Sequence, residues 1–155
     1  MSELEGTPRF IADVMLGRLA RWLRALGYDT VYSSKLDDPE LARWARSEGR
    51  ILLTRDVELT RRRGLNTILI EDDDVVDQLR QVVRTLRLST EGAFSRCLDC
   101  NSLLADYDRA LAASQVPPDV YETQPRFRRC VECGRIYWRG THWARMRAAL
   151  EDIES

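Results

Sequence analysis

Two short pairs of cysteines constrain the fold of this chain more than any other feature. Cys97 pairs with Cys100 and Cys130 with Cys133, each across two residues, and these are the four cysteines of the 155 residues. Each pair can place two thiolates at adjacent corners of a tetrahedron, so together they predict a four-sulfur site for one Zn²⁺ ion. Such a site has no open coordination position, so we expect it to stabilise a small module and to carry no chemistry.

The residues that follow each pair support zinc. Asn101 and Gly134 best tolerate the left-handed backbone that a chain needs where it turns around a metal. Two disulfides or a redox dithiol are the alternatives, but the chain shows no secretory signal pattern and no thioredoxin-like context around either pair. Because no apolar stretch reaches the roughly 18 residues that span a bilayer, we expect a cytoplasmic protein without a membrane partner.

The chain is expected to form two domains, over residues 9–88 and 94–150, because every cysteine lies in the later part. In the first domain, short apolar runs alternate with helical patterns four times, which predicts an α/β fold with a parallel sheet covered by helices. The predicted strands are 9–13, 30–32, 51–54 and 67–70, and the predicted helices are 16–26, 39–48, 57–63 and 75–86. In the second domain we expect helices at 106–113 and 141–153.

Acidic residues follow every predicted strand of the first domain. Asp13 ends the first strand, Asp38 and Asp56 follow the second and third, and Asp72, Asp73 and Asp74 follow the fourth. Ligands of parallel sheets bind beyond the carboxyl ends of the strands, where these side chains would meet. Carboxylates brought together repel one another unless cations lie between them, so the pattern predicts a Mg²⁺ or Mn²⁺ site of the kind that cleaves phosphodiesters.

Helix capping is the alternative role for several of these acids. Asp38, Asp56 and Asp74 each stand where a helix is predicted to begin, and aspartate is a preferred N-cap. Asp13 closes an apolar strand in mid-sheet, where an acid is costly to bury without a partner, so a functional role is favoured for it. The hydroxyl of Thr54 is suited to orienting the Asp56 carboxylate.

Arginines gather in two places, although the net charge is only −1. Arg18, Arg21 and Arg24 align on one side of the first helix. Residues 126–147 contain seven arginines and only one acidic residue, and aromatic residues lie between the arginines. Arginine beside exposed aromatic rings can bind phosphates and stack on bases, and a solvated charged face is the alternative. If this surface binds nucleic acid, the expected contacts of the second domain are Arg128, Arg129, Arg135, Arg139 and Trp138.

Several spaced motifs resemble the Mut7-C family. They are Asp13-Val-Met-Leu-Gly-Arg-Leu-Ala-Arg-Trp-Leu-Arg-Ala-Leu-Gly-Tyr-Asp29, Asp37-Asp38-Pro-Glu-Leu, Arg50-Ile-Leu-Leu-Thr-Arg-Asp56, Arg96-Cys-Leu-Asp-Cys-Asn101 and Tyr137-Trp-Arg-Gly-Thr-His-Trp143. The resemblance implies a PIN-like parallel sheet flanked by helices, followed by a small zinc-ribbon module. It also implies metal-dependent RNA cleavage, with the catalytic acids mapped onto Asp13, Asp38 and Asp56.

The same resemblance assigns Arg18, Arg21, Arg24 and Arg55 to the RNA backbone or the scissile phosphate. The chain departs from the pattern at two acids. PIN nucleases usually have a fourth acid, and the run from Asp72 to Asp74 leaves its identity open. A glutamate is common at the second acidic position, where this chain has the shorter Asp38, with Glu40 as a possible substitute.

The leading hypothesis is therefore a Mg²⁺- or Mn²⁺-dependent endoribonuclease whose zinc module helps to dock RNA. The alternative is a non-catalytic RNA- or ribosome-binding protein with a degenerate PIN fold. A phosphoacceptor domain that uses Asp56 is disfavoured, because the only lysine, Lys35, is in the wrong place. His142, the only histidine, is disfavoured as a general base because a PIN-type site needs none.

Overall fold

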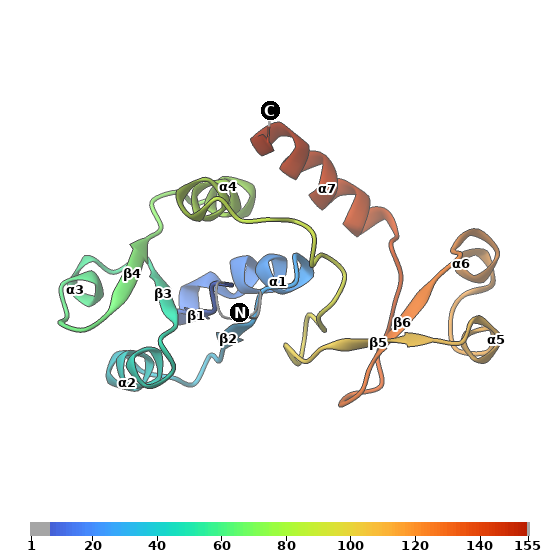
Figure 1. Ribbon diagram of the computed structural model, residues 1–155, viewed down its shortest axis with the longest axis horizontal. Coiled ribbons are helices and arrows are strands. Elements are labelled where there is room, and N and C mark those ends of the chain that lie inside the picture. The colour runs from blue at the N-terminus through green and yellow to red at the C-terminus, as the bar shows by residue number, and fades with distance from the viewer. Residues whose placement is uncertain (1–6, 155) are drawn as a thin grey trace.

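The computed structural model describes residues 7–154, without the side chains of His142 and of residues 152–154. It contains a parallel sheet with its helices and, toward the C-terminus, a small antiparallel sheet (Figure 1). The first part consists of β1 (Phe10–Ala12), the 3₁₀ helix η2 (Val14–Leu16), α1 (Gly17–Ala25), β2 (Thr30–Tyr32), α2 (Asp38–Glu48), β3 (Ile51–Thr54), α3 (Val57–Thr60), β4 (Asn66–Leu69) and α4 (Val75–Leu86). The second part consists of β5 (Leu104–Tyr107), α5 (Arg109–Ala112), α6 (Pro118–Thr123), β6 (Phe127–Cys130), β7 (Ile136–Tyr137) and α7 (Thr141–Glu154).

The larger sheet has four parallel strands in the order β2-β1-β3-β4, which confirms the α/β prediction. Ala12 at the end of β1 pairs with Tyr32 of β2 on one side and with Leu53 of β3 on the other. After β1 the chain forms β2 on one side of β1, and it then crosses to the other side of β1 to form β3. Ligands of open α/β sheets bind where the strand order changes direction in this way. The carboxyl ends of β1 and β3 mark that place.

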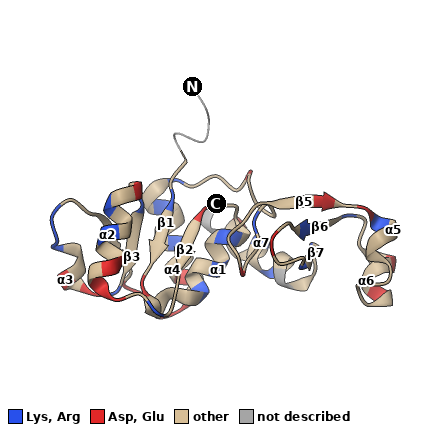
Figure 2. Cartoon of the chain, turned by 90° about the horizontal axis from the view of Figure 1, so that it is seen from below, with Lys and Arg blue, Asp and Glu red and all other residues tan. Residues whose placement is uncertain are grey.

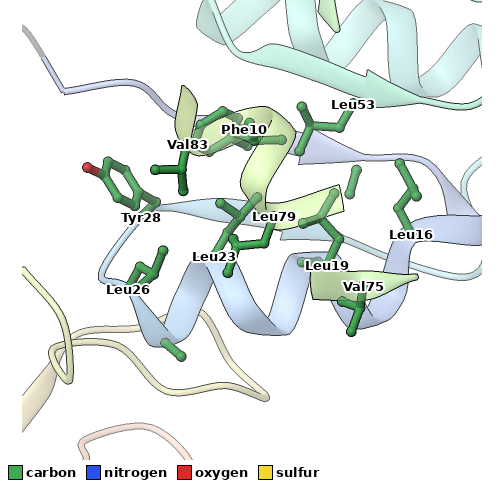
Figure 3. Packing of buried hydrophobic residues seen from close by; sticks show 14 of the residues in the cluster. Phe10, Leu16, Leu19, Leu23, Leu26, Tyr28, Leu53, Val75, Leu79 and Val83 are labelled. Carbon is green, nitrogen blue, oxygen red and sulfur yellow. The ribbon is translucent and has the colours of Figure 1, made fainter. Parts of the chain in front are cut away.

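Alternating side chains of the strands pack against helices on both faces of this sheet. Phe10 and Leu53 lie in one buried cluster with residues of α1 and α4, and Figure 3 shows their packing. Ile11 and Leu52, the next residues along the same strands, lie in a second cluster with residues of α2 and α3. Strand side chains point alternately to opposite faces, so this alternation produces three layers.

Helix α1 has the apolar period that the sequence predicted. Leu19 and Leu23 are fully buried, one turn apart, and the helix ends just before Gly27. Gly27 has a φ of 95°, and a Cβ at this position would overlap the carbonyl of Gly92. Glycine is therefore required here both by the backbone angle and by the close approach of the segment that leads into the second part.

The second part is built on the antiparallel sheet β5-β6-β7. The helix expected at 106–113 is shorter, because residues up to Tyr107 belong to β5 and Asp108 caps α5 by accepting a hydrogen bond from the amide of Ala110. Helix α6, which begins at Pro118, was not expected from the sequence. Proline is tolerated at the first position of a helix, because a backbone N–H at that position has no acceptor within the helix.

Helix α7 returns to the first part of the chain and packs against α4 (Figure 1). Met146 and Leu150 are buried in the same cluster as the α1 and α4 side chains, and Trp143 packs against that cluster. No helix in the described part of the chain is both long and apolar enough to cross a bilayer.

Candidate active site and zinc site

The carboxylate of Asp13 is buried and held in place by two donors. Asp13 directly follows β1, is only 6% exposed and accepts hydrogen bonds from the amide of Met15 and the hydroxyl of Thr54, at 3.1 and 2.9 Å. The two bonds use different oxygens of the carboxylate. A buried acid that accepts fixed donors is an oriented group, as a metal ligand or catalytic acid must be.

Thr54 connects Asp13 with Asp56. Its buried hydroxyl donates to Asp13 and accepts the backbone N–H of Asp56 at 3.0 Å. The sequence predicted that Thr54 would orient the Asp56 side chain, but the carboxylate that it orients is that of Asp13. The exposed Asp56 side chain accepts from the amide of Glu58 at 2.8 Å, which confirms the predicted cap of α3.

Asp38 is not the helix cap that the sequence favoured. The N-cap of α2 is Asp37, which accepts from the amide of Glu40 at 2.9 Å, while the Glu40 side chain accepts from the amide of Asp37. This reciprocal pair forms a capping box and occupies Glu40, the possible substitute ligand. The Asp38 side chain is thereby left out of the cap.

Asp38 interacts electrostatically with the other two acids. Partial burial and then the negative charges of Asp13 and Asp56 raise the pKa of Asp38. Arg62, which follows α3, opposes this shift with its positive charge. Arg62 was missed from the sequence, although it is the middle residue of three consecutive arginines. Acidic segments lie beside the starts of α2 and α3 (Figure 2).

The three aspartates are neighbours without forming a closed ligand shell. Among the described residues, the four cysteines are the group whose ligand atoms all lie within 4.8 Å of one another. The candidates for a fourth acid are all exposed. Asp74 caps α4, as expected, and Asp73 pairs with Arg55 at 2.8 Å. Asp72 makes no ion pair among the described residues, so the identity of a fourth acid stays open.

The structure brings the four cysteines together, as the paired spacing predicted: Cys97 and Cys100 precede β5, Cys130 ends β6, and Cys133 lies in the turn between β6 and β7. The Sγ atoms of Cys97 and Cys133 are 3.8 Å apart. A tetrahedral site with Zn–S bonds of about 2.3 Å has an edge of about 3.8 Å, so this separation suits one zinc ion. All four cysteines are free, in contrast to the alternative of two disulfides. Asn101 and Gly134 have φ angles of 67° and 78°, which confirms the predicted left-handed turns.

The four thiols lie so close together that ionising them is unfavourable unless a cation is bound. A hydrogen bond with Cys133, desolvation and the nearby Cys97 raise the pKa of the Cys100 thiol to about 12. The Tyr137 hydroxyl lies 3.1 Å from the Cys97 sulfur, and burial followed by this contact raises the pKa of Tyr137. A bound divalent ion would stabilise all four thiolates together. The donor set therefore fits zinc.

Comparison with family models gives one match over nearly the whole chain. The model for the Mut7-C RNAse domain matches residues 8–150. This chain belongs to the Mut7-C family. The match covers both the parallel sheet with its aspartates and the cysteine module, so a ribonuclease-like function is supported for the chain as a whole. No curated protein and no solved structure matches this Mut7-C chain.

In this Mut7-C protein, the first cysteine pair is docked directly on the end of α1. Asp99, between Cys97 and Cys100, pairs with Arg21 of α1 at 2.5 Å and with Arg135 at 2.6 Å. Arg24 is buried and donates to the carbonyls of Thr30 and Leu98, at 2.9 and 2.7 Å. This placement argues against the prediction that Arg24 contacts RNA, because its guanidinium fastens the cysteine module to the larger sheet.

The other predicted RNA contacts differ in how available they are. Arg128 is partly buried, donates to the Phe94 carbonyl at 2.7 Å and pairs with Asp106, so it too is engaged within the protein. Arg129 and Arg139 are exposed and make no salt bridge among the described residues. Partial burial and neighbouring arginines lower the pKa of Arg139, which indicates crowded positive charge.

Trp138 is half-buried and packs edge-on against Phe127, with ring centroids 6.3 Å apart, so it also supports the core of the module. On α1, Arg18 is exposed and makes no ion pair within the described part of the chain. The side chain of His142 is outside that part, so the expectation about it stays a prediction.

Proposed function

We propose that this Mut7-C protein is a metal-dependent endoribonuclease and that Asp13, Asp38 and Asp56 hold its catalytic Mg²⁺ or Mn²⁺. One observation supports the proposal: the three carboxylates follow three adjacent strands, at the place where the sheet changes direction, and two of them raise the pKa of the third. Like charges held together in this way are stabilised by a hard cation with oxygen ligands.

Each residue has its own part in the proposed reaction. Asp13 supplies a carboxylate fixed by Thr54, and Asp38 supplies one that the capping box leaves available. The divalent ion, when bound, activates a water molecule and neutralises charge on the phosphate. Arg62 lies close enough to lower the pKa of Asp38, so we assign it to the scissile phosphate. Hydrolysis would leave a 5′ phosphate and a 3′ hydroxyl.

The cysteine module would bind zinc and position the RNA. Its contribution comes from the exposed arginines on aromatic surfaces, in particular Arg139, whose guanidinium lies 5.2 Å from the ring centroids of both Phe94 and Trp143. Such surfaces bind single-stranded nucleic acid through charge and stacking. Zinc binding and RNA positioning both leave the cysteines without a catalytic role, in agreement with a four-sulfur site that has no open coordination position.

A non-catalytic RNA-binding role is the second candidate. It is favoured by the spacing of the aspartates, whose oxygens do not form a group within 4.8 Å among the described residues. A degenerate site would keep the sheet and the arginines while losing the geometry for a metal.

Cleavage of a mixed pool of structured RNAs tests the two candidates. The wild-type protein is incubated with Mn²⁺ and, in parallel, without added divalent ions, beside Asp13→Asn and the control Asp119→Asn. Asp119 is an exposed acid on α6, so its variant removes the same charge far from the sheet. We expect Mn²⁺-dependent cutting that only Asp13→Asn abolishes. RNA that is bound but uncut in every reaction would support the second candidate.

A further inference from the structure

A cavity of about 500 Å³ lies where α1, the cysteine module and the start of α7 meet. All three parts contribute aromatic residues to its lining: Trp22 on α1, Tyr137 and Trp138 from the module, and Trp143 on α7. The three aspartates are not among the described residues that line it. The cavity is therefore a second feature, separate from the proposed catalytic site.

The lining of this cavity is positively charged. Four arginines and no acidic residue are among the described residues around it. Arg96 is held by the carbonyls of Gly27 and Asn101, while Arg21 and Arg135 share the single carboxylate of Asp99. Arg18 is exposed and has no salt bridge in the described structure, so it is available to an anion at the mouth of the cavity.

Flat aromatic walls beside uncompensated arginines match one class of ligand. A nucleotide combines a planar base with a phosphate anion, and base stacking on aromatic side chains tolerates any base. The volume is within the range that encloses small ligands. An acidic peptide would satisfy the arginines, but it would leave the aromatic walls without planar partners.

We propose that this cavity takes one unpaired nucleotide of the RNA, with its base among the aromatic rings and its phosphate at Arg18. The proposal rests on the proposed function, since it names the form of RNA that the same protein binds. Arg18 is five residues after Asp13 on the same η2–α1 segment. The bound nucleotide would therefore stand at a fixed distance along the strand from the bond that is cut. A continuous duplex cannot place a single base there, so the substrate would be single-stranded or bulged at this position.

The test measures binding of a single-stranded oligoribonucleotide in which each base in turn is replaced by an abasic site. Binding is measured in the Asp13→Asn background, where cleavage is expected to be absent, and again after adding Arg18→Ala, Trp22→Leu or the control Arg84→Ala. Arg84 is an exposed arginine on α4 that does not line the cavity. Circular dichroism checks the fold of the Trp22 variant, and the exposed Arg18 variant keeps the test decisive if that variant unfolds.

We expect one register of the oligonucleotide to lose roughly tenfold in affinity when its base is removed. Trp22→Leu should erase this sensitivity, because the two changes remove the same stacking contact. Arg18→Ala should weaken every oligonucleotide that can occupy the cavity, and Arg84→Ala should change little.

Equal affinity for all abasic positions, an unchanged profile in both cavity variants, or no binding of RNA at all would overturn the proposal. Tight binding of acidic peptides in place of RNA would overturn it too.

Failure of the cavity proposal can be distinguished from failure of the proposed nuclease activity. A wild-type protein that cuts RNA without dependence on any single base refutes the cavity proposal alone. A protein with the single-base dependence that never cuts refutes the nuclease and leaves the cavity proposal standing.

Discussion

Replacing Thr54 by valine should both destabilise the protein and slow RNA cleavage. Valine has nearly the shape of threonine, so the change removes only the hydroxyl that joins Asp13 and Asp56. The bond to the Asp13 carboxylate at 2.9 Å is charge-assisted and is worth about 1.5–3 kcal/mol. The Asp56 amide also loses its acceptor, which costs about 1–3 kcal/mol. The more apolar valine offsets about 1 kcal/mol of this, so we expect a net loss of roughly 1.5–5 kcal/mol.

Serine at the same position is the matched control. Thr54→Ser keeps the hydroxyl and removes one buried methyl group, which should cost about 1 kcal/mol. Urea unfolding of both variants and the wild type gives the free energies of unfolding, and an unchanged m-value ensures that they can be compared. Cleavage of one RNA in Mn²⁺ then compares the rates. The serine variant should retain most of the activity, while in the valine variant Asp13 loses one of its two positioning donors.

The reasoning would be refuted if the valine variant were as stable as the serine variant, or if it cleaved RNA at the wild-type rate. Equal free energies of unfolding would mean that the hydrogen bonds of the hydroxyl contribute no net stability. An unchanged rate with reduced stability would mean that the orientation of Asp13 does not limit the reaction.

Three further predictions concern Asp38, Arg24 and Cys130. The raised pKa of Asp38 means that its ionisation costs folded stability, a cost absent in acid and present once the pH exceeds that pKa. At neutral pH without divalent ions, the melting temperature of Asp38→Asn should therefore be higher than that of the wild type. In acid the two melting temperatures should become equal. The same difference in melting temperature at both pH values would contradict the raised pKa. Arg24→Met should cost roughly 2–4 kcal/mol in urea unfolding, because it strands the carbonyls of Thr30 and Leu98, whereas the exposed Arg84→Met should be nearly neutral. Cys130→Ser should abolish bound zinc in a metal assay and lower the melting temperature, and full zinc retention would refute the four-sulfur site.

Much of the fold was predictable because local patterns and tertiary packing agree in the first part of the chain. The period of α1 and the predicted helix over 75–86 match the structure, since their apolar faces are the faces that the sheet buries. The short β5 and helix α6 were not predictable in the same way. Their apolar residues pack into a small satellite cluster around Phe127, where neither helix nor strand period extends beyond a few residues.

The site was predictable at the level of residue types and less so at the level of contacts. Position after a strand was enough to select Asp13, Asp38 and Asp56 as candidates, but the choice of Asp37 as the cap depends on where α2 actually starts. The same limit explains Arg24. Helical spacing placed it beside Arg18 and Arg21, and only the docking of residues 97–101 on α1 shows that it is buried.

That docking implies that zinc and the parallel sheet are energetically linked. The side chain of Asn101, in the turn after Cys100, accepts from the amide of Thr30 in β2 at 2.9 Å and donates to Asp29 at 2.6 Å. Asp29 in turn pairs with the buried Arg50, which also donates to the Phe10 carbonyl of β1. The turn that follows the first cysteine pair therefore satisfies polar groups at the amino ends of the two strands whose carboxyl ends lead to Asp13 and Asp38. Each of these groups would be costly to leave without a partner, so loss of zinc should loosen the strands that position the proposed catalytic acids, although the cysteines perform no chemistry.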